Sequence, residues 1–546
     1  MMTVITIVSF CIHVFSIGYM TDDSRLNKYF SNLGFFTFSM LGIVISSNLL
    51  MLFIFWELVG FSSYLLIGFW SHRPAAVAAA TKAFLMNRLG DIALLTGIIG
   101  IWVSYGTWSL HALEASGILV TTGLGLLIFS GIVGKSAQFP LFSWLPDAME
   151  GPTPVSALIH AATMVAAGVF LLVRIVFLLP EDVLWIIACT GLITSLLGSI
   201  GAVMHYDVKK ILAYSTISQL GLMVMAIGAG VQSAALLHLI AHAFFKALLF
   251  LAAGCLIHAL HRGAHGTSID VQDLRMMGGL RKKMPFTMVA FILGGASLIG
   301  LPMTGGFLSK EVLLESMSPG FFQPAFLLLS VLTVIYSVRL IVYLFFNEPR
   351  LPIEIMEKIR EVPMTMRVSM TLLMIGCLWP GISINPLDLN GWMTSGLDDY
   401  QELHFGIWSI ISVSLAVIAA ISSFFWFRKR TAATYPRLIL NNFGIDLLYY
   451  WIIVKPVLSV ASFTRTTDLQ IIDRLIHGIV RLQVACAYTL AWCDRTLVDG
   501  SVIFASQASL YAGNFFRSFS AGNIQAYIRW ALLGLVIFIA WMLFPI

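Results

Sequence analysis

The sequence predicts an all-α protein, a polytopic bundle of helices that cross a membrane. Of its 546 residues, 59% are hydrophobic and only 11% are charged, whereas soluble domains contain roughly 25% charged residues. A bilayer core about 30 Å thick requires roughly 20 apolar residues per helix, and the chain contains about fourteen such stretches. These stretches are continuously apolar rather than alternating, which indicates helices and not barrel strands. The composition therefore excludes a soluble fold.

The predicted spans follow one another through short polar loops. They cover residues 3–20, 30–47, 49–70, 81–104, 118–138, 154–178, 183–204, 211–230, 234–258, 285–308, 322–346, 365–388, 405–427 and 524–545. The net charge of +5 lies mostly in loops such as 281–283 and 428–430. Charge in such loops is typical of membrane sidedness and does not indicate a nucleic-acid partner.

Two of these helices are interrupted by glycine and proline. Near Lys135 the apolar run breaks at 138–140 and resumes after 146–154, and near Lys310 the interruption covers 300–306. Paired interruptions in two halves of a membrane chain are typical of an internal repeat around a transport path. The alternative is two unrelated loops at membrane depth.

The region from 441 to 509 has too many charges to cross the bilayer facing lipid. Its apolar positions recur at helical spacing, which predicts a long amphipathic helix along the membrane surface, and an interruption near Pro456 fits the same pattern. A pair of connector helices is the alternative. Residues 524–545 follow as a final span.

Several ionisable residues fall inside the predicted spans. Glu57 lies in an unbroken apolar run, where a charge costs about 2.5–3.5 kcal/mol unless it faces a partner or a water-filled cavity. Asp91 is three residues after Arg88, so a local ion pair on one helix face and a role in transport both fit. Residues 207–210 lie at a helix boundary, where a solvated loop end is the preferred interpretation.

Lysines mark both interruptions. Burial disfavours the ammonium form of Lys135, while a nearby carboxylate such as Glu57 favours it, so the two effects oppose each other. A lysine balanced in this way can exchange a proton near neutral pH. The same argument applies to Lys310, which is followed by Glu311.

His238, His242 and Lys246 are spaced four residues apart and drift only about 40° per step around a helix. They therefore form one polar stripe on an apolar helix. A single buried histidine is usually a satisfied core residue, but this stripe predicts a proton relay. His160, alone in its segment, is ambiguous by itself.

Other chemistry has little support. The chain contains no Gly-rich phosphate loop, nucleophile elbow or dinucleotide fingerprint. Its six cysteines occur singly, without the spacing of a zinc or iron–sulfur site. We therefore expect no metal, disulfide or cofactor on this chain.

Five stretches carry a family resemblance: 56–70, 134–138, 151–165, 212–219 and 242–250. They resemble the antiporter-like membrane subunits shared by respiratory complex I and Mrp-type cation/proton antiporters. The resemblance implies two inverted five-helix repeats, each with one broken helix, followed by a lateral amphipathic helix and a transmembrane anchor. It also implies a Glu57–Lys135 charge pair, a hydrated axis lined by His160, His238, His242 and Lys246, and a path through Lys310 to the far side.

The resemblance also implies a division of the chain. The expected parts are an N-terminal segment (1–29) that lacks about two upstream helices of the family, two antiporter-like repeats (30–204 and 205–388), an additional helix (389–430), the lateral helix region (431–523) and the anchor (524–546).

The expected function is that of a proton-translocating membrane-arm subunit of NADH-quinone oxidoreductase. NADH, FMN, iron–sulfur clusters and quinone would then belong to partner subunits, and the partners would be other membrane-arm subunits, especially another antiporter-like one. The expected location is a bacterial inner membrane or a mitochondrial inner membrane. The alternatives are a Mrp-type sodium/proton antiporter subunit and a membrane subunit of a hydrogenase or an inorganic-carbon uptake complex.

Overall fold

A computed structural model describes residues 1–263, 270–317, 320–381, 383, 406–428, 435–520 and 522–543. The chain forms two compact units, Met1–Asp446 and Leu447–Ile546. The end of the predicted span 365–388, the first residue of the span 405–427, part of the charged loop 428–430 and the last residues of the anchor lie outside the described residues.

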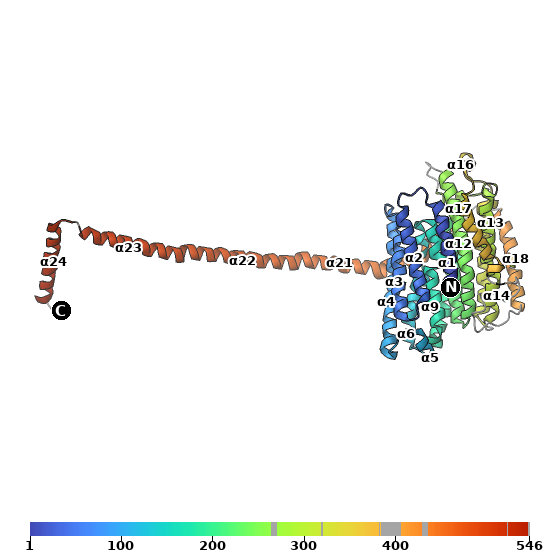
Figure 1. The fold of residues 1–546 in the computed structure, drawn as a ribbon, viewed down its shortest axis with the longest axis horizontal. Helices are drawn as coiled ribbons and strands as arrows, with labels where there is room; N and C mark the ends of the chain where they lie inside the picture. Colours follow the sequence, from blue (N-terminus) through green and yellow to red (C-terminus); the bar gives the residue numbers. More distant parts are fainter. Residues whose placement is uncertain are drawn as a thin grey trace. The chain divides into compact units, whose positions relative to one another are not determined.

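The first unit is a bundle of antiparallel helices (Figure 1). Its N-terminal half contains α1 (Met2–Tyr19), α2 (Leu26–Ile45), α3 (Leu49–Ile67), α4 (Pro74–Tyr105), α5 (Leu110–Ala115), α6 (Thr122–Lys135), α7 (Trp144–Asp147), η1 (Ala148–Glu150), α8 (Thr153–Ala161), α9 (Met164–Ile175) and η2 (Val176–Leu178). Its C-terminal half contains α10 (Glu181–Met204), α11 (Val208–Gly228), α12 (Gln232–Gly263), η3 (Leu274–Met276), η4 (Leu280–Lys282), α13 (Pro285–Ile299), α14 (Gly305–Ser316), α15 (Phe322–Ile341), η5 (Val342–Phe346), α16 (Ile353–Lys358), α17 (Met364–Cys377), η6 (Trp379–Gly381), α18 (Ile407–Arg428), α19 (Arg437–Leu440) and η7 (Asn442–Gly444).

The predicted spans agree with these helices. Within the described residues, twelve helices are long and apolar enough to cross a membrane. Eleven coincide with predicted spans, and the twelfth is the C-terminal helix Asn442–Phe519. The three remaining predicted spans fall on the shorter helices α6, α13 and α17. The chain is therefore a polytopic all-α membrane protein.

Both predicted interruptions are present, and they occupy equivalent places. In the order α2, α3, α4, α6–η1 and α8–α9, the fourth helix is broken after Lys135. In the order α10, α11, α12, α13–α14 and α15, the fourth helix is broken after Ile299, so this second set begins with α10 and not at the expected boundary, residue 205. Successive helices alternate in direction, and each set contains five helices, which is an odd number. The second set therefore begins in the opposite direction and is inverted relative to the first.

The two ends of the bundle differ in charge. The basic end, which we define by loops 20–25, 68–73, 270–284 and 347–352, contains Arg25, Arg73, Arg275, Arg281, Lys282, Lys283 and Arg350. Loops 46–48, 106–121 and 229–231 at the other end contain no lysine or arginine. In Figure 1, α16 lies at the basic end and α5 at the other end.

The first unit ends in a polar contact that joins Asp446 to the first broken helix. Lys82 Nζ lies 2.6 Å from Asp147 Oδ2 and 2.7 Å from Asp446 Oδ1. Ser143 Oγ donates to Asp446 at 2.6 Å, and Tyr214 OH donates to Asn442 Oδ1 at 2.7 Å. The start of the C-terminal helix is thereby fixed beside the segment that follows Lys135.

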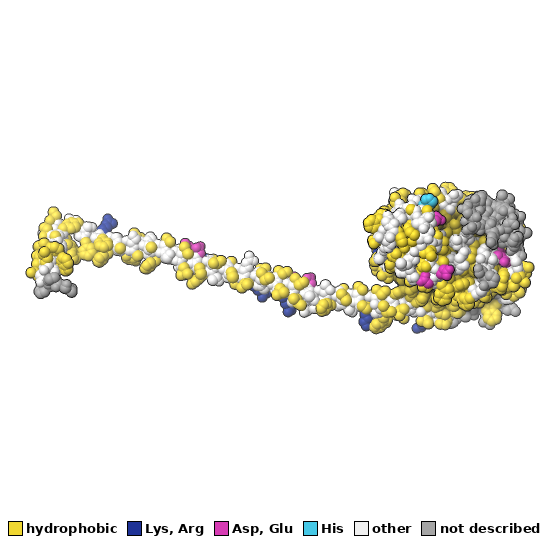
Figure 2. Space-filling view, turned by 90° about the horizontal axis from the view of Figure 1, so that it is seen from below, with side chains coloured by type: hydrophobic (Ala, Val, Ile, Leu, Met, Phe, Trp, Pro, Cys, Tyr) yellow, Lys and Arg dark blue, Asp and Glu magenta, His cyan; other side chains and the backbone are white. Residues whose placement is uncertain are grey.

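The long C-terminal helix comprises α20 (Ile445–Tyr449), η8 (Tyr450–Val454), α21 (Lys455–Thr467), η9 (Asp468–Ile472), α22 (Asp473–Cys493), η10 (Asp494–Val498) and α23 (Asp499–Phe519), and α24 (Ile524–Leu543) follows it. The helix continues through Pro456, because the π turn η8 directly before this proline accommodates the missing amide hydrogen bond. Figure 2 shows apolar side chains along its length with separate charged patches. From α20 to α24 none of the described residues is buried, so an apolar environment or a partner must stabilise this helix.

Candidate functional site

The first group of buried charges lies where α3, α4 and the end of α6 meet. Lys135, the last residue of α6, is fully buried, and its Nζ lies 3.3 Å from Asp91 Oδ2 on α4. The indole Nε1 of Trp56 on α3 donates to the other oxygen of Asp91 at 2.6 Å. Both Asp91 oxygens are therefore compensated, which a buried carboxylate requires.

Glu57 pairs with Arg88 and not with Lys135. The Arg88 guanidinium donates to Glu57 Oε2, while Glu57 Oε1 is buried without a partner among the described residues. The charges therefore pair differently from both expectations. The structure has Arg88–Glu57 and Lys135–Asp91 in place of the expected Glu57–Lys135 pair and of the Arg88–Asp91 pair that the sequence also allowed. The reason is the close approach of α6 to α4 at Gly90, where a Cβ would lie 2.6 Å from Ser130 O. This approach places Lys135 beside Asp91, so Arg88 pairs with Glu57 instead.

Gly60 on α3 leaves the space that the Lys135 ammonium occupies. A Cβ at position 60 would lie 2.6 Å from Lys135 Nζ, the flexible end of the side chain. We therefore expect Gly60→Ala to fold normally but to displace the ammonium from Asp91 and impair transport, measured as proton flux in membrane vesicles. Gly123→Ala on α6, where nothing lies within 4 Å of the added Cβ, is the matched control. Unchanged flux in both variants would contradict this role of Gly60.

The second group follows α12, as the stripe predicts, and His238, His242 and Lys246 are all fully buried. His238 Nδ1 lies 2.9 Å from Ser309 Oγ, and its Nε2 lies 3.1 Å from Gln219 Oε1. The amide oxygen can only accept, so we assign the proton to Nε2. Ser309 Oγ can donate to the neutral ring or turn to Gly306 O, 3.2 Å away. This arrangement accommodates both protonation states of His238.

Lys246 and His160 extend this group toward the first half of the bundle. Lys246 Nζ donates to Ser215 Oγ and, at 3.4 Å, to Leu212 O. The His160 ring on α8 lies 4.9 Å from the Phe250 ring on α12. Neither ring nitrogen of His160 has a partner among the described residues, and His242 Nε2 also has none. His160 is therefore buried without the hydrogen bonds of a satisfied core histidine.

The third group surrounds the second helix break. Lys310 on α14 is buried, and its Nζ donates to Ile299 O at 3.2 Å. Ile299 is the last residue of α13, so this carbonyl has no partner in its own helix. The adjacent Glu311 accepts from Ser412 Oγ at 3.1 Å, and its Oε2 is buried without a partner among the described residues.

Unpartnered buried polar atoms accompany the three groups, and we call the groups and these atoms together the polar axis. Native proteins rarely leave such atoms unpaired, and buried water usually satisfies them. In the described part of the chain, such atoms include Glu57 Oε1, Gln138 Oε1, Ser156 Oγ, both ring nitrogens of His160, Ser195 Oγ, His242 Nε2, Ser337 Oγ and Glu311 Oε2. A cavity of about 10 Å³, enough for roughly one water, lies beside Ser215, Tyr336 and Ser337. Water in these spaces would connect the ionisable groups.

Sequence reasoning missed several contributors. Lys209 was expected in a solvated loop end, but it is buried and donates to Met149 O at 2.5 Å and to Gly151 O at 3.0 Å. The signal that could have shown this is Asp207, whose side chain accepts a hydrogen bond from Lys210 N and caps α11. Lys209 therefore belongs to the first turn of that helix and not to a loop. No sequence pattern marks the residues that contact the charged groups from other helices, namely Trp56 at Asp91 and Ser309 and Gln219 at His238.

Comparisons with known proteins assign the chain to a family. Residues 46–337 match the family model described as NADH:quinone oxidoreductase/Mrp antiporter, TM, which is more than half of the chain. The chain belongs to this family. Residues 1–30 also match the model described as NADH-ubiquinone oxidoreductase (complex I), chain 5 N-terminus.

Individual relatives of this family share much of the chain. NADH-quinone oxidoreductase subunit L of Rickettsia bellii is 39% identical, with 87% of this chain and 79% of the relative covered. NAD(P)H-quinone oxidoreductase subunit 5 of Chaetosphaeridium globosum chloroplasts is 36% identical, with 94% and 85% covered.

Solved structures share the fold. A chain of the Mrp complex from a Dietzia species is 27% identical with a TM-score of 0.67, over 90% of this chain and 54% of that one. A chain of an archaeal membrane-bound sulfane sulfur reductase shares the fold alone, with 21% identity, a TM-score of 0.63 and coverage of 99% and 87%. By their names, the two relatives are subunits of quinone oxidoreductases, and the two solved chains belong to membrane complexes.

Proposed function

We propose that this chain translocates protons in the membrane arm of an NADH-quinone oxidoreductase. The observation that supports this function most directly is the polar axis, in which buried lysines and histidines alternate with unpartnered polar atoms. Charged groups inside a membrane protein are costly and usually mark ion or proton paths. The predicted residues Glu57, Lys135, His160, His238, His242, Lys246 and Lys310 carry the proton, with Arg88, Asp91 and Glu311 in support.

Each of these lysines can release a proton because its amine keeps polar partners in either state. Lys135 and Lys310 lie at helix breaks, where the negative ends of half-helices favour a cation. Moving a charge against 100 mV costs about 2.3 kcal/mol, so an uncoupled path would only dissipate the gradient. Quinone reduction on partner subunits, which hold NADH, FMN, iron–sulfur clusters and quinone, supplies the energy, and this chain itself holds no redox cofactor.

The charge asymmetry of the bundle determines its orientation. Short loops rich in lysine and arginine stay on the cytoplasmic side, so the basic end faces the cytoplasm of a bacterium, or the matrix if the chain is mitochondrial. The bacterial inner membrane is the proposed location. Another antiporter-like subunit is the proposed neighbour, and the C-terminal helix is proposed to lie laterally along such neighbours.

A Mrp-type sodium/proton antiporter subunit is the second candidate, favoured by the 27% identity to the chain of the Mrp complex. Purification of the tagged chain from its native membrane separates the two. We expect flavin and iron–sulfur subunits in the preparation, together with NADH-driven quinone reduction and proton pumping in vesicles. Recovery with antiporter-like subunits alone, and sodium-dependent proton exchange, would instead support the second candidate.

A further inference from the structure

A cavity of about 310 Å³ opens at the basic end of the bundle, among the described residues there. Its walls include the last residue of α1, Tyr19, the residue before α4, Arg73, and His258 near the end of α12. A single buried water needs roughly 10–15 Å³ of such space. The cavity therefore has room for a group of connected waters.

The floor of the cavity is buried and its rim is exposed. Lys209 and Thr153 on the floor are 3% and 1% exposed, whereas Asp22, Arg73 and His261 at the rim are open to solvent. The Lys209 ammonium has three N–H groups, and the carbonyls of Met149 and Gly151 accept two of them. The third N–H group is available to water in the cavity.

Part of the floor lies on the same helix as His160 of the polar axis. Tyr19 OH lies 3.1 Å from Thr153 Oγ1, and the Tyr19 ring lies 5.5 Å from the ring of His258, whose buried Nε2 has no partner in the described part of the chain. Thr153 begins α8, and His160 lies seven residues later on the same helix. Two helical turns correspond to about 10 Å along the axis. A short chain of waters would bridge this distance.

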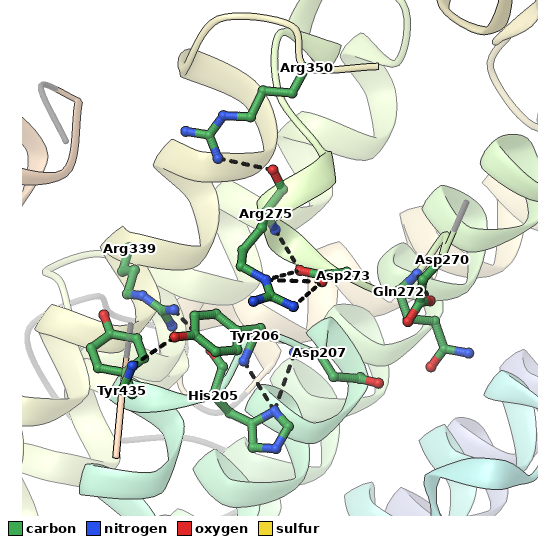
Figure 3. A network of polar contacts seen from close by, with 10 residues as sticks. All are labelled: His205, Tyr206, Asp207, Asp270, Gln272, Asp273, Arg275, Arg339, Arg350 and Tyr435. Carbon is green, nitrogen blue, oxygen red and sulfur yellow. Dashed lines mark hydrogen bonds and ion pairs between the residues drawn. The ribbon is translucent and has the colours of Figure 1, made fainter. Parts of the chain in front are cut away.

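A polar network surrounds the start of α11, just before Lys209 in the chain (Figure 3). His205 Nδ1 accepts from Tyr206 N at 3.1 Å and from Asp207 N at 3.2 Å. Burial, and then the charges of Lys210 and Arg339, lower the pKa of His205 to about 4, so the ring stays neutral and able to accept. Val208 N donates to the carbonyl of Gln272, a residue of the cavity wall. A backbone hydrogen bond therefore joins the first turn of α11 to the cavity wall.

We propose that this cavity is a water-filled uptake vestibule, through which protons from the basic end reach Lys209 and then the polar axis at His160. The proposal rests on the proposed function, because it assigns the entrance of the same path. Carboxylates and imidazoles at the rim exchange protons with bulk water, and the amine at the floor takes up a proton but does not coordinate Na⁺ when charged. The vestibule therefore favours protons over sodium ions.

The first test measures water access without measuring transport. Ile257 lines the cavity and Leu256 does not, although both are buried on α12. The native cysteines are first replaced by alanine in a complex that still pumps. We expect the Ile257→Cys thiol to react with a small charged methanethiosulfonate at least about ten times faster from the basic side than the Leu256→Cys thiol. Equal rates, or reaction from the opposite side, would overturn the vestibule, as would a lipid-filled cavity that leaves both thiols unreactive.

The second test separates proton uptake from a structural role of Lys209. Arginine keeps the charge and can donate to the same carbonyls, but it does not release a proton in proteins. In the intact complex, we expect Lys209→Arg to lower the number of protons pumped per NADH as much as Lys209→Met, while Lys210→Arg remains normal. Normal pumping by Lys209→Arg would overturn the uptake role. If Lys135→Ala also pumped normally, the proposed function itself would fail.

Discussion

Replacing Lys135 by alanine is expected to stop proton transfer through this chain while NADH oxidation continues. The variant leaves Asp91 buried with the Trp56 indole but without its cationic partner. Removing one member of a buried ion pair costs about 3–5 kcal/mol, so Asp91 takes up a proton or reorganises. The measurement is the number of protons pumped per NADH oxidised in sealed vesicles, which should fall by the share that this chain carries.

Two further variants make this result specific. Lys28→Ala removes an exposed lysine on α2 and should pump normally. The double variant Lys135→Ala with Asp91→Ala removes both charges and should assemble better than Lys135→Ala alone, yet it should remain unable to pump. A double variant that pumps would mean that Lys135 only balances Asp91.

Glu57→Ala, which leaves Arg88 without its carboxylate, should also impair pumping in an assembled complex.

Replacing Gly306 by alanine is expected to have the largest effect on stability. A Cβ at this position would lie 1.7 Å from Ser297 O, a backbone atom of α13 that cannot move aside as a side chain can. Gly306 N also donates to Ser297 Oγ at 3.2 Å. The α13–α14 break must therefore open, which displaces Lys310 from the Ile299 carbonyl. We expect little assembled complex on native gels and a clearly lower Tm for what remains.

Gly34→Ala is the matched control for this substitution. Gly34 lies on α2 with nothing within 4 Å of the added Cβ. A glycine in a helix costs about 0.5–1 kcal/mol relative to alanine, so this variant should be neutral or slightly more stable. If Gly306→Ala assembled and pumped like Gly34→Ala, the close packing across the second break would not be required for function.

Much of the site could be predicted from local sequence, because charge in an apolar run is conspicuous. Lys135, His160, His238, His242, Lys246 and Lys310 all lie in the buried interior where they were expected. Their roles as a proton path stay a prediction until the variants are measured. The pairing of the first charges could not be predicted, because it depends on how closely α6 approaches α4 at Gly90. Lys209 was misplaced because its partners, Met149 and Gly151, lie about 60 residues earlier in the chain.

The sequence by itself determined the membrane location, the helix order and the two breaks, because apolar length and the positions of glycine and proline act locally along the chain. Tertiary structure alone decided which carboxylate faces which base, where unpartnered polar atoms collect, and that a cavity reaches Lys209. These features depend on side chains from helices distant in sequence. Their geometry is set by helix packing, which no local pattern encodes.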